Sequence, residues 1–128
     1  MKILVITAHP DDVDFGAGGT VATWVAEGNE VEYCLVTDGQ AGGSDNTVTR
    51  DAVAALRRRE QTAAANMLGV TKLHWLGFPD GAVVADLNLR REISAVIRKV
   101  KPDRVLTQSS ERNYNRIYAS HPDHLATG

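Results

Sequence analysis

The sequence has little cysteine, little net charge and no long apolar run at its N-terminus, and each scarcity excludes a class of protein. Cys34 is the single cysteine among 128 residues, so a disulfide framework within the chain is impossible and a reducing compartment is favoured. A formal net charge of −2 provides no field that would draw the whole chain onto nucleic acid or an anionic membrane. Before His9 the chain has only about five consecutive apolar residues, too few for a signal-peptide core or a membrane span. These features predict a cytoplasmic protein with no nucleic-acid partner and no membrane span.

The composition is that of an ordinary globular protein. Hydrophobic residues make up 43% and charged residues 23%, and 128 residues are enough for one domain with a buried core. Cys34 lies in an apolar run from Val31 to Val36, which predicts a small buried side chain. The only basic run, Arg57-Arg58-Arg59, is followed by Glu60 in a helical pattern, so a solvated helix face is the simplest interpretation.

Short apolar runs alternate with helical patterns along the whole chain. The predicted strands are Lys2–Thr7, Glu30–Thr37, Thr71–Leu76 and Asp103–Thr107. Four helices are predicted. The first carries Val21, Trp24 and Val25 before Gly28, and the second spans about Asp51 to Leu68. The third follows Asp86 as N-cap and runs up to Pro102, and the fourth begins at Leu125. Strands that alternate with helices require right-handed crossovers and a parallel sheet. The sequence therefore predicts an α/β protein with a Rossmann-like three-layer fold.

One helical face can be predicted in the second helix. Its strong helix formers would place one set of apolar residues together: Leu56, Ala63, Ala64, Met67 and Leu68. Gly69 is placed as the C-terminal cap. The segment Asp38–Asn46 is predicted to be a loop from its composition.

A histidine and two adjacent carboxylates follow the first strand. His-Pro-Asp occurs there, at His9, and again at His121, and each copy is followed by another potential metal ligand, Asp12 or His124. The copies are far apart in sequence, but they converge if the first and fourth strands are neighbours at the edge where parallel sheets bind ligands. Histidine and carboxylate ligands around an open position suit zinc or another divalent ion used in hydrolysis.

Simpler interpretations of these residues stand beside the metal site. An aspartate before a helix is often only an N-cap, and both Asp12 and Asp123 have that placement. A lone histidine at a strand end often does no more than hydrogen-bond the scaffold. Two such motifs at one edge of one sheet favour the metal site over these interpretations.

The glycines of Gly16-Ala17-Gly18-Gly19 admit a phosphate-binding interpretation. A dinucleotide fingerprint would need glycine at position 21, where the chain has Val21, and no P-loop lysine is present. Within a predicted loop from His9 to Gly19, these glycines would instead let the backbone turn tightly beside the site. A non-catalytic α/β domain that binds a sugar or nucleotide without metal remains an alternative.

The chain resembles the LmbE-like, or PIG-L, family of zinc-dependent N-acetylglucosamine deacetylases. The resemblance rests on segments that match the family in order: residues 8–16 with Gly18-Gly19-Thr20, Thr37-Asp38-Gly39, Arg57 with Glu60, Leu76-Gly77-Phe78-Pro79-Asp80-Gly81, Lys101-Pro102-Asp103, and His121-Pro122-Asp123-His124. It spans nearly the whole chain, and its first and last motifs are the specific ones.

The resemblance implies a role for each candidate site residue. His9, Asp12 and His124 would bind zinc, and Asp11 would be the general base that takes a proton from the attacking water. His121 would act as general acid or stabilise the oxyanion, with Asp123 orienting it. Two further residues, Arg57 and Asp80, fall at positions that the family uses to contact the sugar. The implied reaction removes the acetyl group from an N-acetylglucosamine-type conjugate.

The chain departs from the family pattern in two places. The family often has glutamate after the two aspartates, where this chain has Val13 and then Asp14. Family members also usually continue well beyond the last motif, whereas this chain stops at Gly128, so residues 1–128 are expected to be the N-terminal part of the family's domain. Another metal-dependent amidase on the same site is a second enzymatic alternative, and an oligomer is compatible with the sequence.

Overall fold

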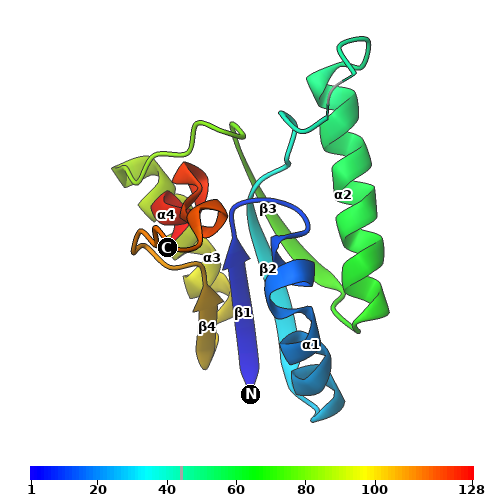
Figure 1. The fold of residues 1–128 in the computed structure, drawn as a ribbon. Coiled ribbons are helices and arrows are strands. Elements are labelled where there is room, and N and C mark those ends of the chain that lie inside the picture. The colour runs from blue at the N-terminus through cyan, green and yellow to red at the C-terminus, as the bar shows by residue number, and fades with distance from the viewer. Residues whose placement is uncertain (44) are drawn as a thin grey trace.

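The predicted alternation of strands and helices is confirmed in the computed structural model, which describes residues 1–43 and 45–128 (Figure 1). The strands are β1 (Lys2–Thr7), β2 (Glu30–Thr37), β3 (Lys72–Phe78) and β4 (Arg104–Thr107). The helices are α1 (Asp12–Ala26), α2 (Arg50–Met67), α3 (Leu87–Val100) and α4 (Pro122–Thr127), with a 3-10 helix at Ile117–Ser120. Ser44, in the predicted loop 38–46, lies outside the described residues.

All four strands are parallel, and their order is β3-β2-β1-β4. β1 lies in the middle, where Ile6 pairs with Cys34 on one side and Thr107 on the other. The predicted adjacency of the first and fourth strands is thus confirmed. It brings the turn after β1 beside the segment that follows β4, at the carboxyl edge of the sheet (Figure 1).

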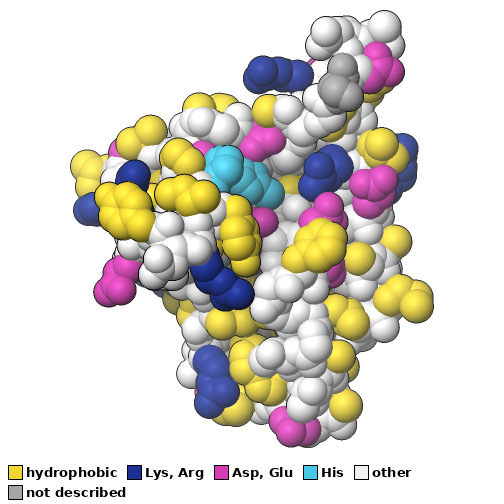
Figure 2. Space-filling view, in the orientation of Figure 1, with side chains coloured by type: hydrophobic (Ala, Val, Ile, Leu, Met, Phe, Trp, Pro, Cys, Tyr) yellow, Lys and Arg dark blue, Asp and Glu magenta, His cyan; other side chains and the backbone are white. Residues whose placement is uncertain are grey.

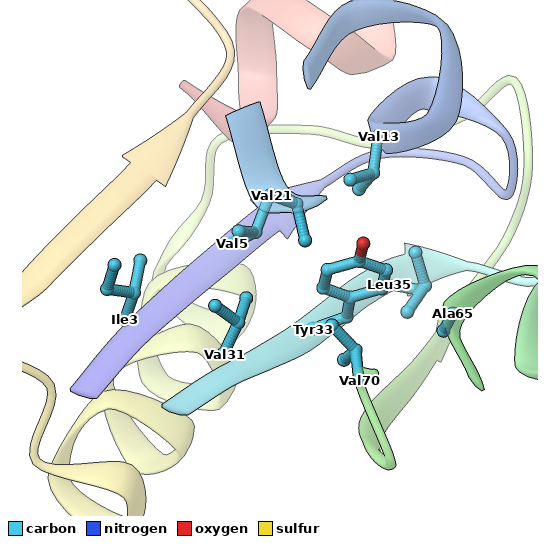
Figure 3. Packing of buried hydrophobic residues seen from close by; sticks show 9 residues of the cluster. All are labelled: Ile3, Val5, Val13, Val21, Val31, Tyr33, Leu35, Ala65 and Val70. Atoms are coloured by element: carbon cyan, nitrogen blue, oxygen red, sulfur yellow. The ribbon is translucent and has the colours of Figure 1, made fainter. Parts of the chain in front are cut away.

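Alternate residues of each strand face opposite layers, which makes the fold three-layered. One buried cluster packs strand residues against α1 and α2 (Figure 3): Ile3, Val5, Val31, Tyr33 and Leu35 with Val13, Val21, Ala65 and Val70. The other packs Leu4, Ile6, Cys34 and Val36 against Val83 and α3. Cys34 is fully buried as predicted, and burial raises the pKa of its thiol to about 12, so the thiol is unreactive.

Helix α1 begins earlier than predicted. The prediction of a loop up to Gly19 is wrong, because the chain is helical from Asp12 and the glycines at 16, 18 and 19 lie inside α1. An added Cβ at Gly16 or Gly19 would meet nothing within 4 Å, so these glycines do not serve a close approach to the site. Burial of Val13 and Val21 on the same helix outweighs the low helix propensity of glycine.

The buried face of α2 also differs from the prediction. Leu56 is 45% exposed and Met67 is 87% exposed, whereas Gln61 and Ala65 are fully buried. The helix is turned so that Arg57 and Gln61 point toward the turn after β1, where both side chains form hydrogen bonds. Polar contacts therefore determine the inward face of this alanine-rich helix.

Helix α3 matches its prediction. The side chain of Asp86 accepts a hydrogen bond from the backbone N–H of Leu89 at 2.9 Å, which is the expected N-cap, and the helix ends before Pro102. β3 runs on to Phe78, past its predicted end at Leu76. Among the described helices, none has the length and apolar character needed to cross a membrane.

The glycines that end α1 and α2 allow a matched stability test. Gly28 and Gly69 have similar φ angles of 86° and 83°. An added Cβ at Gly69 would lie 2.8 Å from Val25 Cγ1, whereas an added Cβ at Gly28 would meet nothing within 4 Å. We expect Gly28→Ala to lower the free energy of unfolding by roughly 1–2 kcal/mol through its left-handed backbone. Gly69→Ala should cost about 1–3 kcal/mol more, because β-branched Val25 must be displaced. Urea denaturation of both variants measures the difference, and equal losses would contradict the contact.

Candidate metal centre

Three separate segments supply the polar residues at the carboxyl edge of the sheet. They are the turn from His9 to Asp12 after β1, the turn at Asp80 after β3, and α4 with the preceding His121. In Figure 2 histidine side chains form one visible patch over this edge, with acidic and hydrophobic side chains around it. Proline follows both His9 and His121, and it restricts the backbone from which each imidazole projects.

Three predicted metal ligands lie together. His9 Nδ1 is 3.2 Å from His124 Nε2 and 3.6 Å from Asp12 Oδ2, and His124 Nε2 is 3.2 Å from Asp12 Oδ2. Ligand atoms about 2.0–2.2 Å from a tetrahedral zinc ion are separated from each other by about 3.3–3.5 Å. The two nitrogens and one oxygen therefore fit three corners of such a site, with the fourth left for water or substrate. These atoms of His9, Asp12 and His124 are called the ligand triangle below.

A second group, formed by His9, His121 and Asp123, fits a metal less well. Asp123 is fully buried, and its carboxylate accepts hydrogen bonds from the backbone N–H groups of Gly81 and Val83 at 2.7 and 3.0 Å. Its Oδ2 is also 2.8 Å from His9 Nε2, closer than two ligands of one zinc ion would lie. This carboxylate, expected beside His121, faces His9 instead.

Two carboxylates hold the ring of His9 from the side opposite the ligand triangle. Asp123 Oδ2 lies 2.8 Å and Asp80 Oδ1 lies 3.0 Å from His9 Nε2. A carboxylate on the second nitrogen of a ligating histidine fixes its tautomer and makes the ligating nitrogen more basic. Asp80 also accepts a hydrogen bond from the backbone N–H of Ala41 at 2.9 Å, which ties it to the loop after β2. A sugar that contacts Asp80 as predicted would bind a carboxylate that already contacts His9 and Ala41.

Hydrogen bonds within the centre shift the pKa values of three of its residues, His9, Asp12 and Asp123. Burial disfavours a charged His9, but hydrogen bonds to Asp12 and Asp123 outweigh burial and raise its pKa to about 9. Burial also works against ionisation of Asp12, yet hydrogen bonds from His124 and His9 hold the pKa of its carboxyl well below the usual range. Hydrogen bonds from His9, Gly81 and Val83 likewise outweigh burial and lower the pKa of Asp123. The carboxylates are anionic, and a metal ion that binds must displace the proton on His9.

Asp11 has an unusual backbone conformation at the start of α1. Its φ of 76° places it in the left-handed region, and it is the N-cap residue although its side chain does not cap the helix. Its Oδ2 accepts a hydrogen bond from Arg57 Nη2 at 3.1 Å, and the same nitrogen donates to the carbonyl of Pro10. The side chain of Asp11 is 46% exposed, so the carboxylate is open to a ligand. Arg57 thus points into the site, and of the basic run only Arg58 and Arg59 are exposed.

His121 is fixed by the helix that it caps. Its Nδ1 accepts a hydrogen bond from the backbone N–H of Asp123 at 3.1 Å, and its ring centroid lies 4.8 Å from that of His9. Since Nδ1 is an acceptor, a neutral His121 must carry its proton on Nε2.

Neither Asp12 nor Asp123 is an N-cap, as the simpler interpretation of the sequence had it. Asp12 Oδ2 accepts a hydrogen bond from the backbone N–H of His9, and Asp123 accepts hydrogen bonds from the backbone N–H groups of Gly81 and Val83.

Sequence reasoning missed two glutamines. Gln108 directly follows β4; its Nε2 donates to Asp12 Oδ2 at 3.0 Å, and its Oε1 accepts from the backbone N–H of Ala8. Gln61 lies one turn after Arg57 on α2, and its Oε1 accepts from the backbone N–H of Asp11. A polar residue at a strand's carboxyl end was a usable signal for Gln108. Spacing from Arg57 was the only signal for Gln61.

A cavity of about 960 Å³ opens beside the ligand triangle. Asp11, Asp12 and His124 form its inner wall. Its outer walls come from α1 and from the loop after β4: Phe15, Gly16, Gln108, Ser109, Glu111, Arg112, Asn113, Tyr114, Asn115, Arg116, Tyr118 and Ala119. Exposed aromatic rings and polar groups are thus available to a ligand that reaches the centre, and the volume suits a small molecule.

Fold and donor set together define a parallel α/β protein with a candidate divalent-metal site at the carboxyl edge of its sheet. The chain belongs to the PIG-L family, because the family model described as GlcNAc-PI de-N-acetylase matches residues 4–128. The resemblance seen in the sequence motifs is therefore confirmed.

Several known proteins similar to this chain are named as deacetylases. Diacetylchitobiose deacetylase of Thermococcus kodakarensis is 39% identical over 127 residues, covering 99% of this chain and 46% of that protein. A probable N-acetyl-alpha-D-glucosaminyl L-malate deacetylase 2 of Bacillus cereus is 33% identical and covers 98% of this chain and 57% of that protein. The solved N,N'-diacetylchitobiose deacetylase from Pyrococcus horikoshii has a TM-score of 0.92 and 37% identity, covering 99% of this chain and 46% of that one. The chain spans about half the length of the curated relatives it matches.

Removing one ligand tests the metal centre. We expect His124→Ala to weaken zinc binding by more than about 100-fold, because it removes a nitrogen of the ligand triangle rather than an outer partner. His74→Ala is the matched control. His74 lies outside the site, and its Nε2 is 2.7 Å from Glu32 Oε2. Titration calorimetry with zinc measures both variants. Equal affinities for the two would rule out the ligand role of His124.

Gln108 should tune the same affinity through Asp12. We expect Gln108→Met to weaken zinc binding by about 10–100-fold, because Asp12 Oδ2 loses the donor that orients it. Circular dichroism should show an unchanged fold. Zinc affinity equal to that of the unsubstituted chain would contradict this role.

Proposed function

We propose that the chain is a zinc-dependent hydrolase that removes the acetyl group from an N-acetylglucosamine-type conjugate. The observation that carries the proposal is the triangle of His9, Asp12 and His124 donors with the half-exposed carboxylate of Asp11 beside it. Membership of the PIG-L family and the names of the similar proteins support an acetamido sugar as substrate. A cytoplasmic location remains a prediction from the sequence.

The ligand triangle would hold the metal, and the residues around it would handle protons. A zinc ion held there supplies a Lewis acid that activates water and polarises an amide carbonyl. Asp12 contributes its Oδ2, while its other partners, the His9 N–H and Gln108, keep the carboxylate in one orientation. Asp80 and Asp123 hold His9 from behind, so the ring cannot turn its Nδ1 away.

Asp11 would act as the general base. It is adjacent to a ligand in sequence, yet its carboxylate points to the cavity and makes no contact with the ligand triangle among the described hydrogen bonds. Arg57 donates to Oδ2, which leaves Oδ1 free to accept a proton from water. The water oxygen bonds to the acetyl carbon as that proton leaves.

His121 would donate a hydrogen bond to the oxyanion that forms on the acetyl oxygen. Its Nδ1 accepts from the Asp123 N–H, so the neutral ring carries its proton on Nε2. The C–N bond of the amide would break as the nitrogen takes up the proton that Asp11 accepted from water, which gives acetate and a free amine. Arg57, which is partly exposed beside Asp11, and Asp80 are the two predicted sugar contacts.

An amine-release assay tests this function directly. The chain is incubated with zinc and a panel of acetamido-sugar conjugates, and free amine and acetate are quantified. Equal amounts of both products from at least one conjugate are expected. A panel of simple N-acetyl amides without a sugar serves as the control, and release only from those would favour a different amidase.

Asp11→Asn separates catalysis from metal binding. We expect zinc content to stay unchanged and kcat to fall by about 10²–10⁴-fold, because the variant loses a base and no ligand. Asp103→Asn is the control, since Asp103 accepts from the Lys2 N–H at the opposite end of β1. Near-normal turnover in Asp11→Asn would refute the assigned role.

A further inference from the structure

Asp11 holds a left-handed backbone conformation, which is uncommon for a non-glycine residue. Its φ of 76° and ψ of −17° are left-handed, and Lys101 is the one other non-glycine residue with positive φ in the described chain. Lys101 ends a helix, where this conformation is common, but Asp11 begins one. Such strain persists only where the surroundings hold it, and it tends to occur at functional sites.

The amide of Gln61 contacts this strained residue from a fully buried position. Gln61 Oε1 accepts a hydrogen bond from the backbone N–H of Asp11 at 2.6 Å, and Gln61 Nε2 donates to Asp14 Oδ2 at 3.2 Å. A backbone N–H only donates, so the oxygen of the amide must face Asp11 and its nitrogen must face Asp14. Both ends of the side chain are therefore committed, and Gln61 is 0% exposed.

These two bonds join the turn after β1 to the first turn of α1. Arg57, one turn earlier on α2, holds the carboxylate of Asp11 and the carbonyl of Pro10. Gln61 holds the N–H of the same residue. Loss of the bond to Gln61 would free the peptide between positions 10 and 11, and with it the left-handed φ that sets the direction of the Asp11 side chain.

We propose that Gln61 is a positioning residue that fixes Asp11, through its backbone N–H, in the orientation needed to take a proton from water. The inference rests on the proposed function only in giving Asp11 the role of base. Displacement of a reacting group by about 1 Å can cost about 10²-fold in rate, so a buried residue that never touches substrate can control turnover.

Gln61→Met removes both hydrogen bonds at similar volume. We expect kcat to fall between about 10-fold and 100-fold, while KM and zinc content change little. Val70→Ala is the control, because Val70 is fully buried in the core cluster that packs against α2 and has no polar side-chain atom. It should lower Tm and leave kcat within about 2-fold, so a loss of kcat in Gln61→Met no greater than this overturns the proposal.

A reversal of donor and acceptor tests the same contact in a second way. Gln61→Glu combined with Asp14→Asn keeps an acceptor for the Asp11 N–H, and the new amide at position 14 donates to the new carboxylate at position 61. We expect this double variant to recover kcat to within about 3-fold of the unsubstituted chain. Its failure to recover, in a folded and zinc-loaded protein, would count against the proposal.

The amide signal of Asp11 provides a readout independent of turnover. A short hydrogen bond moves the amide proton downfield in ¹H–¹⁵N NMR and protects it from hydrogen exchange. Gln61→Met should shift this signal upfield and abolish the protection, and the double variant should restore both. If the chain releases no amine, the proposed function fails and the contact is judged by this signal alone; an unchanged signal in Gln61→Met then overturns it.

Discussion

The parallel pairing of β1 with β4 is the contact on which the site depends. It joins Ile3–Ile6 to Arg104–Thr107, and the chain that leaves β4 reaches His121 and His124 by one loop and a 3-10 helix. The turn that leaves β1 carries His9 and Asp12. The two halves of the ligand triangle thus come from opposite ends of the chain and meet because two strands share hydrogen bonds. Gln108 extends this pairing by one residue, since it binds Ala8 and Asp12 at once.

The same edge assigns different tasks to neighbouring carboxylates through their surroundings. Asp12 faces two imidazoles, whose hydrogen bonds hold its pKa well below the usual range, whereas Asp11 faces an arginine and a cavity. Asp123 is buried, and its carboxylate accepts hydrogen bonds from two backbone N–H groups of the loop after β3 in addition to its contact with His9. Burial and hydrogen-bond partners, not residue type, distinguish these three carboxylates.

Local patterns were enough to predict the element order, the neighbouring strands, the N-cap at Asp86 and the approach of His9, Asp12 and His124. Each of these depends on periodicity, on capping chemistry or on where strands end in a parallel sheet. The start of α1, the inward face of α2 and the roles of Gln61 and Gln108 depend on contacts between residues distant in sequence. A glycine-rich segment is a poor helix on propensity alone, and only the burial of Val13 and Val21 makes it one. The partners of Asp123 could not be predicted for the same reason.

The meeting of two segments distant in sequence at one centre has a thermodynamic consequence. A ligand that binds only the folded chain stabilises it by mass action, and at a hundred times its Kd the gain is about 2.7 kcal/mol. A metal ion bound through His9 and His124 would join the turn after β1 to α4, so metal occupancy and the attachment of α4 to the sheet edge would rise and fall together.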